Sequence, residues 1–212
     1  MKVLLIHGHP NPEAFNRALA DAYLEGAAAA GADVRVVDLS ELTFDPVLRK
    51  GYAEIQPLEP DLIEAQKALL WADHLVLAFP VWWGAAPALL KGFLDRTFLP
   101  GFAFRFPDVW PLPEKLLRGR SAHVIVTMDS PRPIYSLLYR DSAHRSVVRG
   151  TLQFCGFHPI TTSDISAVKY LPEAWRERSV RHQRRLGETF VRRQLRPPFA
   201  KRLWTRLTEA VG

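Results

Sequence analysis

Five short segments rich in apolar residues are spaced along the chain, each of a length that suits a buried β-strand. They cover residues 3–6, 34–37, 75–79, 122–127 and, more weakly, 157–163. Segments that are apolar at nearly every position, and not only at alternate ones, indicate a sheet that is covered on both faces. Such sheets are parallel, so we expect the five strands to run in one direction.

Helical patterns lie between these segments. Residues 15–30 are rich in Ala and Leu and are followed by Gly31, a residue that favours the end of a helix. Further helices are expected over 61–71, from Pro87 onward, and over 141–149. Strands that alternate with helices predict an α/β fold, namely a flavodoxin-like, doubly wound five-stranded parallel sheet of order 2-1-3-4-5.

Composition agrees with one globular domain. The chain has 212 residues, of which 48% are hydrophobic and 24% charged, and this balance excludes wholesale disorder. We predict a single domain over 1–196 and a basic C-terminal tail over 197–212. The single cysteine, Cys155, excludes a disulfide framework and a multi-thiolate zinc site. With no evident leader or membrane span, a cytoplasmic location is expected.

The positive charge is concentrated at the C-terminal end. Residues 173–212 contain 11 Lys/Arg and 4 Asp/Glu, a balance of +7, whereas residues 1–172 contain 17 and 18, a balance of −1. No basic patch with interleaved aromatic residues is evident on the main body, so nucleic-acid binding is not predicted. The basic end could contact an anionic membrane surface or an acidic transport protein, although a solvated helix and tail is the plainer interpretation.

Three segments that directly follow predicted strands carry the candidate chemistry: residues 7–16, 79–88 and 127–135. In a sheet of this order, ligands bind outside the carboxyl ends of strands 1, 3 and 4. The first segment ends at a helix N-terminus, whose free N–H groups suit a phosphate, but it matches neither a G-x-G-x-x-G nor a Walker A loop. Its paired histidines lack a third ligand at metal-binding spacing, so no metal is predicted.

The other two segments suit a planar ligand. Trp82 and Trp83 could form a flat wall for an aromatic ring, and Thr127 with the backbone after it could bond the polar edge of a heterocycle. Core packing of the tryptophans and an ordinary surface loop after Thr127 are the alternatives.

Taken together, three motifs resemble a known family. They are H-P-x-P-x-x-F-N after the first strand, F-P-x-x-W-x-x-x-P-A-x-L-K-G-x-x-[DE]-R-x-F after the third, and F-C-G-F at 154–157. They resemble the flavodoxin-like NAD(P)H:quinone oxidoreductases, which include mammalian quinone reductase and bacterial modulator-of-drug-activity proteins. The resemblance covers about residues 1–165. It implies a noncovalent flavin, FAD or FMN, with NAD(P)H as reductant, and a homodimer whose sites lie at the interface.

The resemblance also implies roles for individual residues. Tyr135 falls where the family has an active-site tyrosine and is the predicted catalytic residue. Apart from the resemblance, His144 could act beside it as a proton donor, or it could be an ordinary residue of the helix over 141–149. The predicted cofactor-binding residues are His9, Phe15 and Asn16 at the phosphate or ribityl chain, Pro80, Val81, Trp82, Trp83 and Gly84 around the ring, and Thr127, Met128, Asp129 and Ser130 at its pyrimidine end.

Two positions depart from the family pattern. Ala14 stands where the family usually has a hydroxyl residue before Phe-Asn, and the loss of such a donor costs about 1–3 kcal/mol if nothing replaces it. Asp129 lies where other members have a Gly-rich turn, and its carboxylate would oppose a nearby anionic ring. Asn11, Arg17 or a water could replace the lost donor, and Asp129 could instead face solvent, so the two departures bear on how tightly flavin binds and not on the fold.

The predicted function is hydride transfer from NAD(P)H through a bound flavin to a quinone or a similar electrophile, with both substrates using one pocket in turn. Two alternative functions fit the same residues. The protein could be a flavin-binding ancillary subunit of a membrane transport system, with secondary oxidoreductase activity. It could also be a structural dimer that has lost its flavin.

Overall fold

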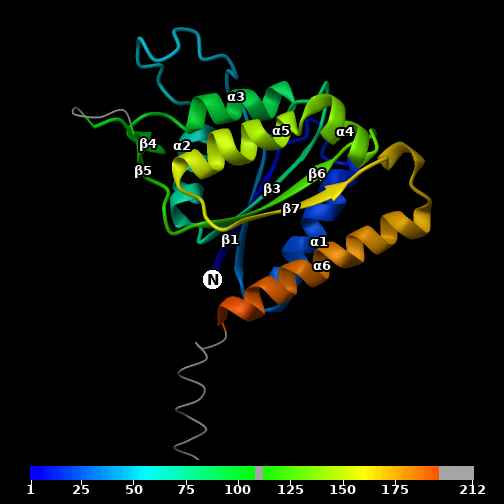
Figure 1. Ribbon diagram of the computed structural model, residues 1–212. Coiled ribbons are helices and arrows are strands. Elements are labelled where there is room, and N and C mark those ends of the chain that lie inside the picture. Colours follow the sequence, from blue (N-terminus) through cyan, green and yellow to red (C-terminus); the bar gives the residue numbers. More distant parts are fainter. Residues whose placement is uncertain (108–111, 196–212) are drawn as a thin grey trace, which may run out of the picture.

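The computed structural model describes residues 1–107 and 112–195 (Figure 1). A parallel five-stranded sheet runs through its centre in the order β2-β1-β3-β6-β7. Numbered along the chain within this sheet, that order is 2-1-3-4-5, so the predicted topology is confirmed. The strands are β1 (Lys2–His7), β2 (Asp33–Asp38), β3 (His74–Pro80), β6 (Ser121–Thr127) and β7 (Ile160–Ile165).

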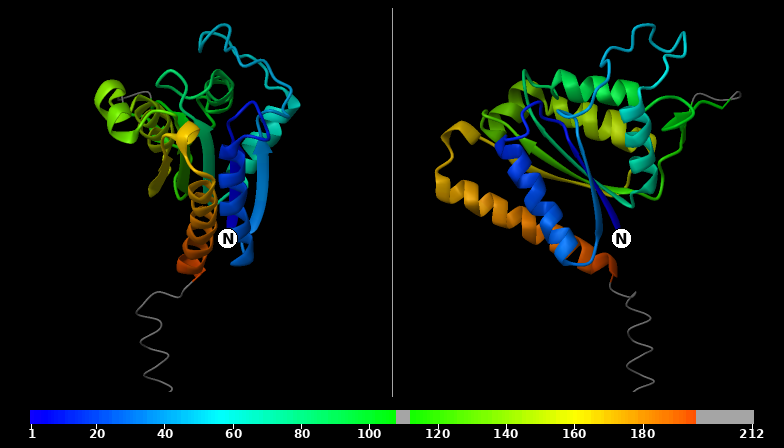
Figure 2. Two further views of the ribbon diagram at one scale, coloured as in Figure 1. Left: turned by 90° about the vertical axis from the view of Figure 1, so that its right-hand side faces the viewer. Right: turned by 180° about the vertical axis from the view of Figure 1, so that it is seen from behind.

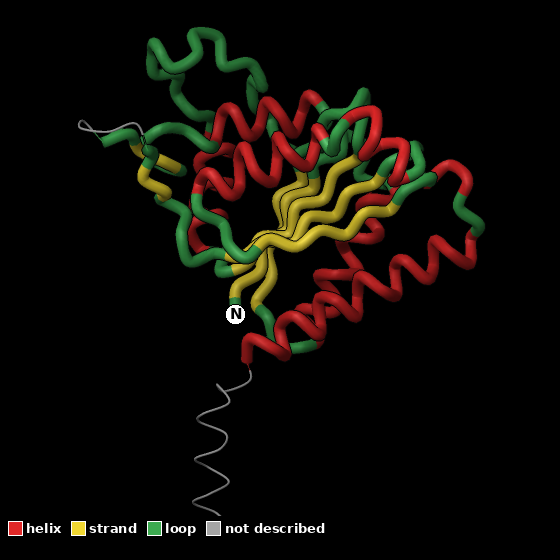
Figure 3. The backbone as a smooth tube through the Cα atoms, in the orientation of Figure 1, coloured by secondary structure: helices red, strands yellow, loops and turns green. Residues whose placement is uncertain are grey.

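Helices cover both faces of the sheet (Figures 2 and 3). One face carries α1 (Phe15–Ala29) and α6 (Glu173–Leu195). The other face carries α2 (Pro60–Trp71), α3 (Ala88–Thr97), α4 (Arg132–Tyr139), α5 (Ser142–His144) and the π-helix η1 (Arg145–Gln153). Smaller elements are the hairpin β4 (Phe104–Arg105) and β5 (Glu114–Lys115), and the 3-10 turn η2 (Val168–Tyr170).

Alternation along the strands builds two hydrophobic cores. In β1, Val3 and Leu5 face α1 and α6, whereas Leu4 and Ile6 face the opposite helices. All seven residues of β3 are buried because this strand is central and covered on both sides. The apolar pattern of the sequence therefore reflects a two-faced sheet, as expected for this architecture.

Helices α1 and α6 cross with their backbones in contact. A Cβ atom added at Gly26 would overlap the carbonyl of Arg184, and one added at Gly187 would overlap the carbonyl of Tyr23. Only glycine allows this approach, because it leaves no side chain between the helices. The crossing fixes α6 against the C-terminal half of α1.

A buried polar cluster lies between the sheet and these two helices. The Tyr23 hydroxyl is 3.1 Å from His74 Nε2, and His74 Nδ1 is 2.8 Å from Ser121 Oγ. His123 Nε2 lies 3.0 Å from Ser163 Oγ, and the His123 ring stacks on Tyr23. Burial lowers the pKa of His74 to about 3 and that of His123 to about 4, so both are neutral at pH 7.

Two expectations about secondary structure need correction. Helix α4 forms in the segment after Thr127, for which the sequence pattern indicated a surface loop and no helix. Pro131 serves as its N-cap and Pro133 falls in its first turn, where proline is tolerated. The fifth strand begins at Ile160, not at residue 157. Its centre is polar because β7 is an edge strand with exposed Thr161 and Thr162.

Within residues 1–107 and 112–195, no helix is both long enough and apolar enough to cross a membrane. The predicted basic tail, 197–212, lies outside the described residues. The domain boundary at residue 196 therefore stays a prediction.

Candidate active site

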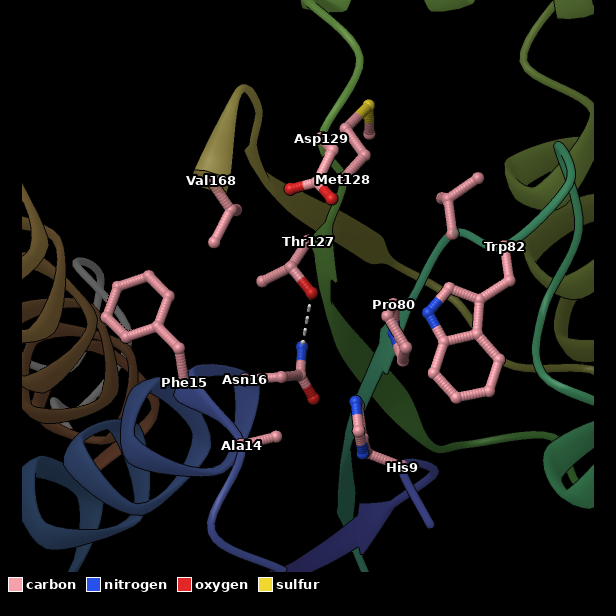
Figure 4. Close-up of a pocket in the computed structure, with 11 residues that line it drawn as sticks. His9, Ala14, Phe15, Asn16, Pro80, Trp82, Thr127, Met128, Asp129 and Val168 are labelled. Carbon is pink, nitrogen blue, oxygen red and sulfur yellow. Dashed lines mark hydrogen bonds between the residues drawn. The ribbon is translucent and has the colours of Figure 1, made fainter. Parts of the chain in front are cut away.

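A cavity of about 170 Å³ opens at the carboxyl ends of β1, β3 and β6 (Figure 4). It brings together nine of the predicted cofactor-binding residues from all three sequence segments. They are His9, Phe15, Asn16, Pro80, Val81, Trp82, Thr127, Met128 and Asp129, and Ala14 and Val168 complete the lining.

The hydrogen bonds of His9 fix which ring nitrogen can donate. The backbone N–H of Asn11 donates to His9 Nδ1 over 2.9 Å. Burial and the neighbouring His7 lower the pKa of His9, so its ring is neutral at pH 7. A neutral imidazole that accepts at Nδ1 carries its proton on Nε2. His9 therefore offers one N–H donor and packs edge-on against Trp82, with ring centres 5.3 Å apart.

Asn16 carries the clearest sign of a missing ligand. Its side chain is 2% exposed, and its Nδ2 donates to Thr127 Oγ1 over 3.3 Å (Figure 4). Within the described part of the chain, its Oδ1 has no hydrogen-bond partner. Buried amide oxygens are almost always paired, so this acceptor at the cavity wall suits a ligand that brings a hydroxyl or N–H donor. A flavin, with its ribityl hydroxyls, fits this requirement.

Asp129 uses its carboxylate within the protein. Its Oδ1 accepts a hydrogen bond from the backbone N–H of Lys169 over 3.0 Å. The N–H of Val168 donates to the carbonyl of Met128 over 3.1 Å. These bonds join the segment after β6 to the turn after β7. The residue that departs from the family's Gly-rich turn thus closes one wall of the cavity.

A tight turn separates the two tryptophans. Trp82 and Ala85 exchange two backbone hydrogen bonds of 2.9 Å, and Trp83 and Gly84 occupy the turn with φ values of 51° and 75°. Two successive positive φ values are typical of a type I′ turn. The turn directs Trp83 outward, where it is 98% exposed, while Trp82 lines the cavity. Trp83 and Gly84 therefore lie outside the cavity.

Tyr135 is not brought to the cavity either. It is 1% exposed, and its hydroxyl accepts a hydrogen bond from the Ala143 N–H over 3.0 Å. His144 Nδ1 lies 3.4 Å from the same hydroxyl, and His144 Nε2 lies 2.7 Å from Asp164 Oδ1. Helix α4 turns the phenol toward α5. Ser130 also lies outside the cavity, and the predicted catalytic role of Tyr135 stays a prediction.

A charged cluster supports the loop beneath the cavity. His7 Nδ1 lies 3.2 Å from Asp38 Oδ2, and Arg17 pairs with the same carboxylate. Burial of Asp38 opposes its ionisation, but hydrogen bonds from Ser40 and the charge of nearby groups outweigh it, and the pKa of the carboxyl is lowered. This cluster ties the ends of β1 and β2 to the first turns of α1, which positions Phe15 and Asn16.

Two features of the site were not predicted from the sequence. Val168 lines the cavity from the connection after the last strand, which no motif marks. A second cleft of about 390 Å³ adjoins the cavity between α1 and α6, and Phe15 lines both. Arg176 lies in this cleft with its guanidinium 5.3 Å from the centre of the Phe15 ring. The carboxyl end of the fifth strand was the one topological hint, since it lies at the same edge.

A parallel sheet of this order with a ligand cavity at its carboxyl edge defines a flavodoxin-like protein. A family model described as "Flavodoxin-like fold" matches residues 1–189, and the chain belongs to this family.

Its relatives include named oxidoreductases. The "Ribosyldihydronicotinamide dehydrogenase [quinone]" of Pongo abelii is 29% identical over 181 residues, which cover 74% of this chain and 77% of the relative. An NAD(P)H oxidoreductase of Haemophilus influenzae is 29% identical over 167 residues, covering 76% and 81%. The solved NAD(P)H:quinone oxidoreductase from Methanothermobacter marburgensis matches with a TM-score of 0.75 and 25% identity, covering 90% and 96%. The resemblance stated from the sequence is confirmed.

The replacement Ala14→Ser should strengthen both the fold and flavin binding. Ala14 is the N-cap of α1, with extended φ and ψ and no side-chain hydrogen bond. A serine there would stabilise the helix by about 1 kcal/mol and offer a phosphate one more donor, which we expect to lower the flavin Kd about tenfold. Urea unfolding of the apoprotein and flavin titration measure the two effects. Ala14→Gly is the control, and an unchanged Kd with serine would place the phosphate elsewhere.

Proposed function

We propose that the protein is a flavin-dependent oxidoreductase that passes a hydride from NAD(P)H to a quinone or a similar electrophilic acceptor. The observation that carries this proposal is the cavity at the sheet edge, with the unpaired, buried Oδ1 of Asn16 at its wall. The names of the relatives support the same substrate class.

The side chains of the cavity suit binding and orientation. A bound flavin supplies the redox chemistry, since it takes up a hydride and returns two electrons to an acceptor. Asn16 would accept a hydrogen bond through Oδ1, and His9 would donate one through Nε2–H. Pro80 and Trp82 would form the apolar wall that orients a planar ring. Because both substrates would use one cavity in turn, we expect ping-pong kinetics.

We favour FAD over FMN because of the cleft between α1 and α6. This cleft adjoins the cavity at Phe15, where the Arg176 guanidinium lies beside the aromatic ring, and its rim also carries Glu173 and the Arg181–Glu177 ion pair. A cation suits a diphosphate, and an aromatic face suits an adenine. FMN would leave the cleft empty, whereas the adenylate half of FAD would occupy it.

A bulky side chain in this cleft should weaken the binding of FAD but not that of FMN. Ala18 is an exposed residue of α1 at the cleft, so Ala18→Phe should fold normally. We expect the Kd for FAD to rise at least tenfold and the Kd for FMN to change less than twofold, as measured by fluorescence titration. Ala28→Phe, on an exposed part of the same helix, is the control. Equal losses for both flavins would contradict the assignment of the cleft.

We also propose a homodimer with sites at the interface. The cavity of about 170 Å³ is smaller than the roughly 300–1,000 Å³ of most ligand sites, so a second surface is needed to enclose a flavin. Helix α4 presents Ile134, Leu137 and Leu138 to solvent, an apolar surface of the kind that a partner covers. Sedimentation velocity of the flavin-loaded protein measures the assembly directly.

The enclosed position of Tyr135 leads to a specific expectation. Removal of a proton donor that acts in the reaction lowers turnover by about 10²–10⁴-fold. Because the hydroxyl is bonded to Ala143 inside the protein, we expect Tyr135→Phe to lower turnover less than threefold and the unfolding free energy by about 1 kcal/mol. Steady-state kinetics and urea unfolding measure both, with Tyr139→Phe as the control. A hundredfold loss of turnover would instead support the predicted catalytic role of Tyr135.

An absorbance spectrum tests the whole proposal. The protein is purified without added cofactor, loaded with FAD or FMN, and desalted. We expect flavin bands near roughly 370 and 450 nm that survive desalting and bleach with NAD(P)H. Bands that survive without bleaching would favour the ancillary-subunit alternative. A failure to retain any flavin would overturn the proposal.

A further inference from the structure

Strand β7 leaves one edge of the sheet free. Among the described residues, β7 pairs with β6 alone. The carbonyls of Pro159 and Ile165 accept hydrogen bonds from the β6 side. Successive residues of a strand turn their backbone groups to opposite edges, so Ile160, Thr162 and Asp164 present their N–H and C=O groups outward.

Strand β7 carries little of the usual protection against edge pairing, because its one charged residue, Asp164, is already paired with Arg132 and His144. Exposed edges are commonly blunted by lysine, proline, a bulge or a covering element. Strand β7 reads Ile-Thr-Thr-Ser-Asp-Ile and contains neither lysine nor proline. The opposite edge strand, β2, carries the exposed charges Asp33 and Arg35. Strand β7 is therefore the edge that is open to a further strand.

A basic cleft flanks this edge on each face of the sheet. The η1 cleft, about 340 Å³, lies where Thr162 faces Arg145 and Arg149. The α6 cleft, about 350 Å³, lies where Ser163 faces Arg178 and other residues of α6, including Trp175, Ser179 and His182. Side chains of an added strand would enter the two clefts alternately, because successive residues point to opposite faces.

The cations of these clefts are available to a ligand. In the described chain, Arg145 and Arg149 have no carboxylate partner, although they stand four residues apart on one helix and repel each other. Arg178 lies over the Trp175 ring and is likewise without a carboxylate in the part of the chain described. The nearby Asp164 is already paired with Arg132 and His144. Both clefts therefore attract negative charge.

We propose that the β7 edge binds an extended acidic segment of a partner protein as an added β-strand. Backbone hydrogen bonds to Ile160, Thr162 and Asp164 would supply affinity, and Asp or Glu side chains in both clefts would supply specificity. The chain's own residues 196–212 do not suit the edge, because they carry four basic residues and one acidic residue. The proposal is independent of the oxidoreductase activity.

The experiment uses the full-length, flavin-loaded protein and a fluorescent peptide, (Glu-Glu-Val-Val)3, followed by anisotropy. This repeat places glutamates on both faces of an extended strand. We expect saturable binding that weakens at least tenfold when alternate backbone nitrogens of the peptide are methylated, since those nitrogens can no longer donate. The (Lys-Lys-Val-Val)3 peptide should not bind.

Variants of the protein test each part of the surface. The double change Arg145→Glu with Arg149→Glu, and separately Arg178→Glu, should weaken peptide binding at least tenfold. Thr162→Pro removes an outward N–H and spares the bonds to β6, so it should cost tenfold, whereas Thr162→Ala should cost less than twofold. None of these residues lines the flavin cavity, so oxidation of NAD(P)H should be unchanged.

Three outcomes would overturn the proposal. If neither N-methylation of the peptide nor Thr162→Pro changes the affinity, the peptide is held by charge attraction alone and not as an added strand. Binding to vesicles of anionic lipid without binding to the peptide would make it a lipid surface. Loss of self-association in the Arg145→Glu, Arg149→Glu variant, with no peptide binding in the parent protein, would make it an interface between copies of this chain.

Discussion

Replacement of Asn16 by leucine should weaken flavin binding by about 10- to 100-fold and leave the apoprotein nearly as stable as before. The loss in affinity follows because a buried acceptor that waits for a ligand donor disappears, which removes about 1.5–3 kcal/mol of binding free energy. The stability change is small because two effects oppose each other. One hydrogen bond to Thr127 is lost, and one unpaired buried oxygen is removed.

Flavin titration and urea unfolding of the apoprotein measure the two quantities separately. Gln183→Leu is a matched control, because Gln183 is also a buried amide with an unpaired oxygen in the described structure, and it lies outside the flavin cavity. This control should leave the flavin Kd unchanged. A large loss of stability in Asn16→Leu, with affinity retained, would make Asn16 a structural residue only.

Mild acid should destabilise the protein strongly between pH 6.5 and about 4.5. His74 and His123 have folded pKa values of about 3 and about 4, both below the unfolded value of 6.5. Their neutral forms stabilise the fold fully above pH 6.5, and this contribution is lost as the pH falls and the unfolded chain takes up protons. By pH 4.5 the contribution of each histidine to the free energy of unfolding has fallen by about 2.7 kcal/mol. The two together account for about 5 kcal/mol, a large part of the stability of a typical domain.

In this pH window, the loss of stability comes from the histidines and not from the buried carboxylates. The pKa values of Asp38 and Asp164 are lowered below the ordinary value of 3.8, so those groups act at lower pH. The unfolding free energy should fall by up to about 2.5 kcal/mol per pH unit in this window, and His123→Gln should lower that slope by about half. Exposed His158→Gln should leave it unchanged. A flat profile in the parent protein would contradict neutral burial of both rings.

The sheet was predictable because its signal is local. A strand covered on both faces must be apolar at almost every position, as β3 is, and such runs stand out in the sequence. The edge strand β7 exposes Thr161 and Thr162, so its pattern is weaker and its start was misplaced. Helix α4 was missed because Pro131 and Pro133 resemble loop punctuation, although both stand at a helix start, where proline fits.

The site was predictable as far as chain topology decides it. The carboxyl ends of parallel strands meet at one edge, which brings Asn16, Trp82 and Thr127 together from three separate motifs. Side-chain direction was not predictable, because it depends on backbone angles that the motif does not contain. The turn at Trp83 sends that ring outward, and the rotation of α4 buries Tyr135.

Because α1 and α6 are in backbone contact at Gly26 and Gly187, we expect the two helices to move as one rigid unit. No side chain lies between the helices at this crossing, and Arg176 of α6 packs on Phe15, so we expect a shift of α1 to be passed to α6. Helix α6 has 23 residues and spans about 35 Å, from the cavity side of the molecule to its C-terminal end. A dye attached at the exposed Gln194, near the far end of α6, is expected to respond when a ligand fills the cavity.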